Sequence, residues 1–211
     1  MEQAIARENI LVKIRVALQR KTVLPFPDQL GSQEVFKVGN EELPLQYEKE
    51  FKRLMGKLYY CRDIDEMRLQ LMLLATRYGW KDLTIPPDLL SSLTGLDKLP
   101  FVNTGPALQA DATLTDCECL VARTGTIVLS SAQSAGRALP VFTPVHMVFA
   151  FPRQLMPDIR QAITFLKNKY PEGMPSSVVF ASGPSRTADI EKTLVVGVHG
   201  PREVFLFLLQ E

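Results

Sequence analysis

Apolar residues along the chain follow two different spacings, which together predict alternating helices and strands. A spacing of three to four residues predicts amphipathic helices over residues 47–55, 64–78 and 153–169. Short apolar runs bounded by turn residues predict strands over residues 57–61, 81–85, 119–122, 125–131, 146–151, 176–182 and 203–209. This alternation favours the α/β fold class, with a mostly parallel sheet and flanking helices.

The first 45 residues differ from the rest of the chain. Residues 1–20 carry apolar side chains at near-helical spacing, which predicts an amphipathic helix that packs on another surface. From Thr22 to Leu45, prolines and glycines interrupt every periodicity, so we expect a long irregular arm. Such segments are uncommon inside compact domains and often contact partners. We therefore expect a helix and arm over residues 1–45 and an α/β domain over residues 46–211.

Composition and charge exclude several classes of protein. The 211 residues are 46% hydrophobic and 22% charged, as in an ordinary soluble globular domain. The net charge of +1 gives no basic surface of the kind that attracts nucleic acid. No run of about 18 apolar residues occurs, and charged residues interrupt the N-terminal stretch, unlike a signal peptide. We therefore expect a cytoplasmic protein with no membrane insertion.

The three cysteines favour buried thiols over a metal or redox centre. They are Cys61, Cys117 and Cys119, an odd number without the spacing of a disulfide framework. Cys117 and Cys119 are too close for the usual Cys-x-x-Cys knuckle, and alternation along a strand would send both sulfurs to one face. A metal or redox role is the minor alternative. No set of cysteines here can hold an iron–sulphur cluster.

The stretch SGPSRTADIE, residues 182–191, is the first candidate site. It follows a predicted strand, and in open α/β sheets ligands bind beyond the carboxyl ends of strands. Its composition permits a short helix after the turn. The amides of that helix, the hydroxyls of Ser185 and Thr187 and the guanidinium of Arg186 would together bind a phosphate or carboxylate.

A purely structural interpretation of the same stretch stays open. Ser182 or Ser185 would cap the helix, and Arg186 would pair with Asp189 three residues later. Glycine, proline and serine are also ordinary residues of turns and helix starts.

The second candidate site is Thr124-Gly125-Thr126 with Arg137 and His146 downstream. The glycine would let the backbone approach a ligand closely, and the threonine hydroxyls would orient a carbonyl or phosphate. Alternatively, Gly125 only permits a turn and the threonines suit a strand.

Two histidines are candidates for acid–base chemistry. His146 begins a predicted strand, and His199 lies between two glycines in GVHGP. Each could instead be a structural histidine. The spacing reveals no nucleophile–base pair, and neither a Walker loop nor a Gly-x-Gly-x-x-Gly motif is present.

Four of these features, in this order, resemble the LUD domain family over residues 46–211. They are Thr124-Gly125-Thr126, the approach from Leu139-Pro140 to His146, SGPSRTADIE and GVHGP. The resemblance implies the fold shared by glucosamine-phosphate deaminase, ribose-phosphate isomerase and the CoA transferases. It also implies a bacterial cytoplasmic protein that acts with two iron–sulphur partner proteins in oxidising L-lactate to pyruvate. The clusters are then expected in the partners, with no cofactor and no metal in this chain.

One residue departs from the family pattern. Arg123 precedes the Thr-Gly-Thr, where members of the family usually carry an acidic residue. A glutamate at a comparable strand end is the nucleophile of related CoA transferases. The arginine therefore argues against a covalent acyl-enzyme in this chain.

The resemblance also implies one pocket for a small anionic ligand, formed by both candidate sites. Ser185, Arg186 and Thr187 would hold the anionic group, with Thr124 and Thr126 opposite. Asp189 and Glu191 would hold Arg186 and its loop in place. The predicted ligand-binding residues are Thr124, Gly125, Thr126, Arg137, Ser182, Gly183, Ser185, Arg186, Thr187, Asp189 and Glu191, and the catalytic candidates are His146 and His199.

Three functions remain open at this point. The first is a component of a lactate-oxidising system that carries no iron–sulphur cluster. The second is a free-standing enzyme or sensor for a phosphorylated or acyl-CoA metabolite. The third is a structural scaffold with a vestigial pocket. Whether the protein is catalytic is left undecided by its sequence.

Overall fold

The computed structural model describes residues 2–19, 41–190 and 193–210. The chain divides into two units, Met1–Gly39 and Asn40–Glu211. The first unit contains helix α1, Glu2–Gln19. Most of the predicted arm lies outside the described residues. Its predicted end at Leu45 is wrong, because helix α2 spans Leu43–Arg53 and has proline in its first turn, where the missing amide hydrogen costs nothing.

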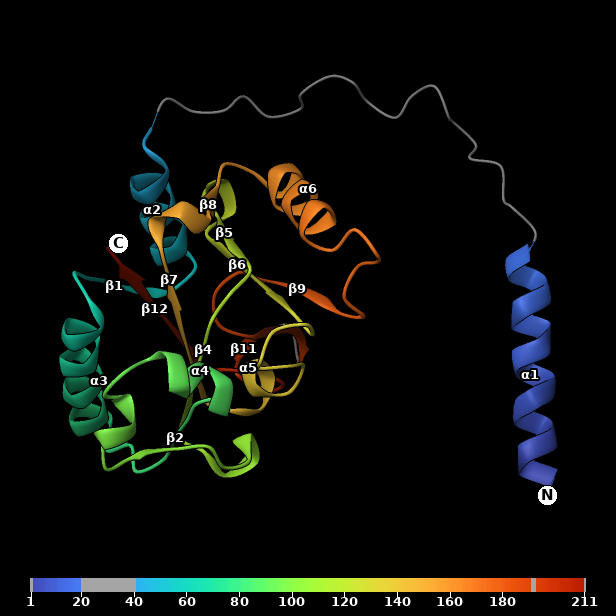
Figure 1. The fold of residues 1–211 in the computed structure, drawn as a ribbon, viewed down its shortest axis with the longest axis horizontal. Helices are drawn as coiled ribbons and strands as arrows, with labels where there is room; N and C mark the ends of the chain where they lie inside the picture. The colour runs from blue at the N-terminus through green and yellow to red at the C-terminus, as the bar shows by residue number, and fades with distance from the viewer. Residues whose placement is uncertain (1, 20–40, 191–192, 211) are drawn as a thin grey trace. The chain divides into compact units, whose positions relative to one another are not determined.

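The second unit is built around a six-stranded sheet in which all neighbouring strands are parallel (Figure 1). The strand order is β1-β12-β7-β4-β2-β3. The predicted α/β fold class with a mostly parallel sheet is confirmed. The strands are β1 Lys57–Cys61, β2 Leu83–Thr84, β3 Val102–Asn103, β4 Ala112–Thr115, β7 Val145–Ala150 and β12 Glu203–Leu209, and the neighbouring helices are α3 Ile64–Tyr78, α4 Pro87–Ser92 and the short turns η2 Leu96–Lys98 and η3 Ala107–Gln109.

A second, mixed sheet stands beside the first, and the sequence did not predict it as a separate layer. Its order is β8-β5-β6-β9, with β6 antiparallel to both β5 and β9. Figure 1 shows helix α6 beside this sheet. The elements are β5 Cys119–Val121, η4 Ala122–Thr124, β6 Thr126–Ser130, α5 Leu139–Phe142, η5 Pro152–Gln154, β8 Leu155–Met156, α6 Ile159–Lys169 and β9 Val178–Ala181.

Two predicted helices differ from the structure. The helix predicted from Arg153 begins only at Ile159, because the Asp158 carboxylate caps it by accepting a hydrogen bond from the Ile159 amide. The short helix predicted after Gly183 is wrong. Residues Arg186–Ile190 form strand β10, which pairs antiparallel with β11, Thr193–Val196. No helix N-terminus therefore exists there to bind an anion, and Ser182 and Ser185 have no helix to cap.

The core lies on both faces of the central sheet, and strand β12 contributes to both. Phe205 and Phe207 pack in one cluster with α3 and α4, whereas Leu206 and Leu208 pack in the other with α2. Alternate residues of a strand point to opposite faces, so one strand buried on both faces reads as a continuous apolar run. In the part of the chain that the structure describes, no helix is both long enough and apolar enough to cross a bilayer.

Candidate functional site

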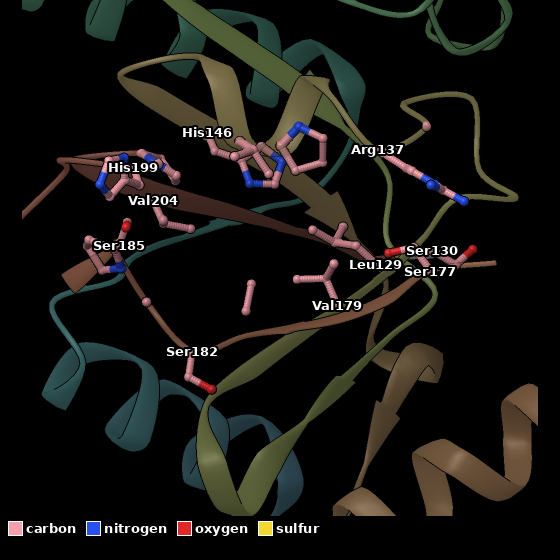
Figure 2. Close-up of a pocket in the computed structure, with 18 of the residues that line it drawn as sticks. Leu129, Ser130, Arg137, His146, Ser177, Val179, Ser182, Ser185, His199 and Val204 are labelled. Atoms are coloured by element: carbon pink, nitrogen blue, oxygen red, sulfur yellow. The ribbon is translucent and has the colours of Figure 1, made fainter. Parts of the chain in front are cut away.

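A cavity of about 290 Å³ lies between the central sheet and the second sheet. Strands β7 and β12 contribute His146 and Val204, and strands β6 and β9 contribute Leu129 and Val179. Figure 2 shows these side chains around the cavity, with Ser185 and His199 on one side and Arg137 on the other. The apolar floor and the polar rim are typical of a site for a small molecule.

The cavity lies at the amino end of the central sheet, not at the carboxyl end where we expected a site. His146 is the second residue of β7 and Val204 the second residue of β12, and the two are paired in register. The carboxyl end of strand β9 does reach the cavity through Ser182 and Gly183. At this cavity, therefore, strand β9 contributes its carboxyl end, whereas β7 and β12 contribute their amino ends.

His146 is a buried, neutral histidine. His146 is 2% exposed, and its Nε2 atom forms a hydrogen bond of 2.9 Å with the Thr115 hydroxyl on the neighbouring strand β4. Burial lowers the pKa of His146 to about 4, because a charged ring would lose its hydration. At neutral pH the ring is an uncharged hydrogen-bonding group, and a poor proton acceptor.

Another wall of the cavity is formed by two loops that backbone hydrogen bonds hold together. The Ser185 amide donates to the Pro201 carbonyl at 2.9 Å, and the Gly197 amide donates to the Ser185 carbonyl at 2.8 Å. These bonds tie the SGPS turn to the loop that carries His199, which is exposed. The two stretches that the sequence singled out separately are thus brought together at this wall.

Arg137 is the cation at the cavity. It lies in the turns that precede α5, and one of its guanidinium nitrogens donates to the Ser176 hydroxyl. A guanidinium has five N–H donors, so the remaining ones can receive an anionic ligand. Ser130 and Ser177 lie on the same side of the cavity in Figure 2.

Thr124, Gly125 and Thr126 are not lining residues, although hydroxyls connect them to the rim. The Thr124 and Thr126 hydroxyls are 2.8 Å apart, and the Thr126 and Ser182 hydroxyls are 2.7 Å apart. Gly125 has a φ of +57° and lies directly against the backbone of α2. The close approach that glycine permits is therefore to a helix of the same chain.

Arg186 and Thr187 also lie outside the cavity lining. The Arg186 guanidinium donates to the Leu54 carbonyl at 2.8 Å, just after the end of α2. The structure thus shows Arg186 bonded to the backbone of this chain, and its contact with an anionic ligand stays a prediction, as does its pairing with Asp189. Asp189 is part of β10, but its side chain lies outside the described residues, as does all of Glu191.

The cysteines are free, buried thiols. Cys117 and Cys119 pack in different clusters, so the prediction that their sulfurs share one face is wrong; Cys117 precedes strand β5 instead of continuing it. Burial raises the pKa of Cys61 to about 11 and of Cys119 to about 12, and raises that of Cys117 as well. Across residues 2–19, 41–190 and 193–210, no three His, Cys, Asp or Glu side chains are grouped to hold a metal ion.

We expect these thiols to be nearly inert while the protein is folded. Two pKa units lower the thiolate fraction about 100-fold, and the thiolate is the nucleophile. Alkylation by iodoacetamide at about pH 8, followed by mass spectrometry, should be at least about 100-fold slower in the folded protein than in guanidinium chloride. Rapid labelling of Cys117 in the folded protein would contradict its buried position.

Comparison with known proteins identifies the family. The sequence pattern of the LUD domain matches residues 102–209, a little more than half of the chain. This chain belongs to the LUD domain family. Every residue that lines the cavity lies inside the matched region.

The curated relatives of this LUD chain include proteins called Lactate utilization protein C. The one from Bacillus licheniformis is 34% identical over 107 residues, and the one from Bacillus pumilus is 41% identical over 108 residues. Each match covers 50% of this chain and 45% of the relative, so the chain matches less than half the length of these relatives. A crystal structure of a DUF162 family protein from Deinococcus radiodurans has a TM-score of 0.59 at 20% identity, and covers 80% of this chain and 96% of that chain. It supports the fold.

In this LUD domain the unusual Arg123 has a structural partner. Its guanidinium donates to the Asp158 carboxylate at 2.7 Å, which also lowers the pKa of that carboxyl. Asp158 is the cap of α6, so the ion pair joins the turn between β5 and β6 to that helix. Arg123 does not line the cavity.

Sequence reasoning missed the strand residues of the cavity, among them Leu129, Ser130, Val179 and Val204. Apolar residues in strands give no local signal that one of them faces a cavity and another the core. Ser130 could have been noticed, because it ends an apolar run at a strand terminus. Of the predicted residues, the cavity brings together Arg137, His146, Ser182, Gly183, Ser185 and His199.

Proposed function

We propose that this protein is a component of a bacterial L-lactate utilisation system and that its cavity binds a small carboxylate. The observation that carries this proposal is that the cavity lies wholly within the LUD domain match, in a chain similar to proteins called Lactate utilization protein C. In lactate utilisation a 2-hydroxy acid is oxidised to a 2-oxo acid. Both compounds are small carboxylates, the class of ligand that a guanidinium beside hydroxyl groups recognises.

The proposed ligand contacts follow from the chemistry of the lining. The Arg137 guanidinium would hold the carboxylate, while serine hydroxyls at the rim would bond to the 2-hydroxyl or 2-oxo oxygen. His146, held by Thr115, would add an uncharged hydrogen-bonding group from the floor. We propose ligand recognition as the role of this site.

The electrons of lactate oxidation would then pass to partner proteins. We propose that these partners are the iron–sulphur proteins expected from the family resemblance. Affinity purification of the tagged protein from lactate-grown cells under anaerobic conditions, with iron analysis, tests this assembly. Co-purification of iron–sulphur proteins is the expected result. Recovery of the chain alone would favour a free-standing ligand-binding protein.

Replacing Arg137 with glutamine should weaken binding of L-lactate or pyruvate by about 10-fold or more, since a hydrogen bond to a charged group is worth about 1.5–3 kcal/mol. Isothermal titration calorimetry measures the effect. Arg53→Gln is the matched control, because that side chain is 80% exposed and lies on α2. Absence of saturable binding to the wild-type protein, or equal binding by Arg137→Gln, would count against the proposed ligand.

A further inference from the structure

A second and larger cavity, of about 610 Å³, lies at the opposite end of the central sheet. It begins where β4 and β7 end, at Asp116 and Phe151, and it extends to α4 and α6. It shares no lining residue with the first cavity. The carboxyl end of a parallel α/β sheet is where such folds bind ligands, and this volume is in the range of ligand pockets.

A buried carboxylate organises one wall of this second cavity. The Glu118 side chain is 0% exposed and accepts hydrogen bonds from the Ser130 hydroxyl at 2.5 Å and from Lys169 and Tyr170 at 2.7 Å each. Burial alone would raise the pKa of Glu118, but these three donors outweigh it and lower the pKa. Glu118 therefore stays ionised and fixes the Lys169 ammonium at the cavity.

Lys169 retains capacity for a ligand. Its side chain is 45% exposed, and Glu118 uses one of the three N–H donors of the ammonium. Arg153 lines the same cavity, with its guanidinium carbon 4.3 Å from the centre of the Phe151 ring. Two cationic side chains thus face the cavity, and both suit a carboxylate.

Asp116 provides an acceptor that lacks a donor. Its Oδ1 is buried and has no hydrogen-bond partner among the described residues. Burial raises the pKa of Asp116, against a hydrogen bond from Gln133 that lowers it. A buried carboxylate oxygen without a donor is costly, and an ammonium group brought by a ligand would relieve that cost.

The remaining walls are mostly apolar, with Ser92 and Gln154 as polar exceptions. Phe149, Phe151 and Phe165 line the cavity together with Leu89 and Leu93. An apolar body of substantial size can therefore be buried next to the charged groups. The two acidic and two basic side chains balance, so a ligand with no net charge suits the cavity best.

We propose that this second cavity binds a zwitterionic α-amino acid with a large apolar side chain. Asp116 receives its ammonium group, Lys169 and Arg153 receive its carboxylate, and the phenylalanine rings contact its side chain. This site is separate from the carboxylate site proposed above and does not depend on it.

L-Phenylalanine is the probe that tests the proposal, compared with 3-phenylpropionate, which lacks the ammonium, and L-3-phenyllactate, which carries a hydroxyl in its place. Calorimetric titration of the full chain should show saturable binding of L-phenylalanine. Both analogues should bind at least about 10-fold more weakly. Asp116→Asn should weaken the binding of L-phenylalanine by at least about 10-fold and leave the binding of 3-phenylpropionate nearly unchanged. Arg153→Gln should weaken both compounds, because both carry the carboxylate.

Asp97→Asn is the matched control, since Asp97 is exposed and lines neither cavity. It should bind all three compounds as the wild type does. Three results would each overturn the proposal: no saturable binding of L-phenylalanine, binding of an analogue as tight as that of L-phenylalanine, or unchanged selectivity in Asp116→Asn.

Discussion

Replacing Gly125 with alanine is expected to destabilise the protein by at least about 3 kcal/mol. The positive φ of +57° alone costs an alanine about 1–2 kcal/mol. The added Cβ would also lie 2.5 Å from the Phe51 amide nitrogen and 2.7 Å from the Glu50 carbonyl carbon. Phe51 is 0% exposed and packs in the core, so the helix cannot move away without opening that core. Denaturation in guanidinium chloride, monitored by circular dichroism, measures the loss.

Gly79→Ala is the control for backbone strain. Gly79 ends helix α3 with a φ of +70°, and a Cβ there would meet no atom within 4 Å. Its substitution should cost only about 1–2 kcal/mol. Equal losses at Gly79 and Gly125 would mean that the contact with α2 contributes nothing to stability.

The position of Gly125 shows how a motif can be recognised while its physical role is misjudged. A glycine between two threonines indicates a close backbone approach, but the sequence does not say to what. The structure brings the second unit's first helix, α2, against this glycine. The threonine hydroxyls then continue to Ser182 at the cavity rim. The motif therefore lies behind the cavity rim and does not line the cavity.

More of the fold than of the candidate site could be predicted from the sequence. Strand β12 reads as a continuous apolar run because both of its faces are buried, and such runs are typical of parallel sheets. The error at Arg186–Ile190 has a different cause. The residues of a short polar segment suit either a helix start or a strand, and pairing with β11 decides between them. Strand β11 follows only a few residues along the chain, since Ile190 pairs with Thr193, so the sequence analysis missed a local hairpin here and not a long-range contact.

The cavity itself depends on pairing between strands that are distant in sequence. His146 reaches it because β7 lies between β12 and β4, and Thr115 on β4 then fixes the ring. From the sequence, His146 and His199 could be named as candidates by their residue type and neighbouring turns. Only the strand order makes His146 buried and neutral, and only the loop that joins β11 to β12 leaves His199 exposed.

The buried position of His146 should also make the protein lose stability between about pH 6.5 and pH 4. The unfolded histidine has a pKa of about 6.5, whereas burial lowers the folded pKa to about 4. Above pH 6.5 the ring is neutral in both the folded and the unfolded state, so the titration of His146 costs the protein no stability. As the pH falls, the unfolded chain binds the proton first, so unfolding becomes more favourable until the folded protein is protonated too. The difference of about 2.5 pKa units corresponds to about 3 kcal/mol.

The test compares the wild type with His146→Gln, which removes the titrating group and keeps an amide that can bond to Thr115. Between about pH 7.5 and pH 5, the free energy of unfolding should fall by about 2 kcal/mol more in the wild type than in the variant. Carboxylates that titrate in this range affect both proteins and cancel in the comparison. Parallel pH profiles would contradict the buried, neutral state of His146. A steeper wild-type profile would support it, and would favour hydrogen bonding over proton transfer as the contribution of His146 to ligand binding at neutral pH.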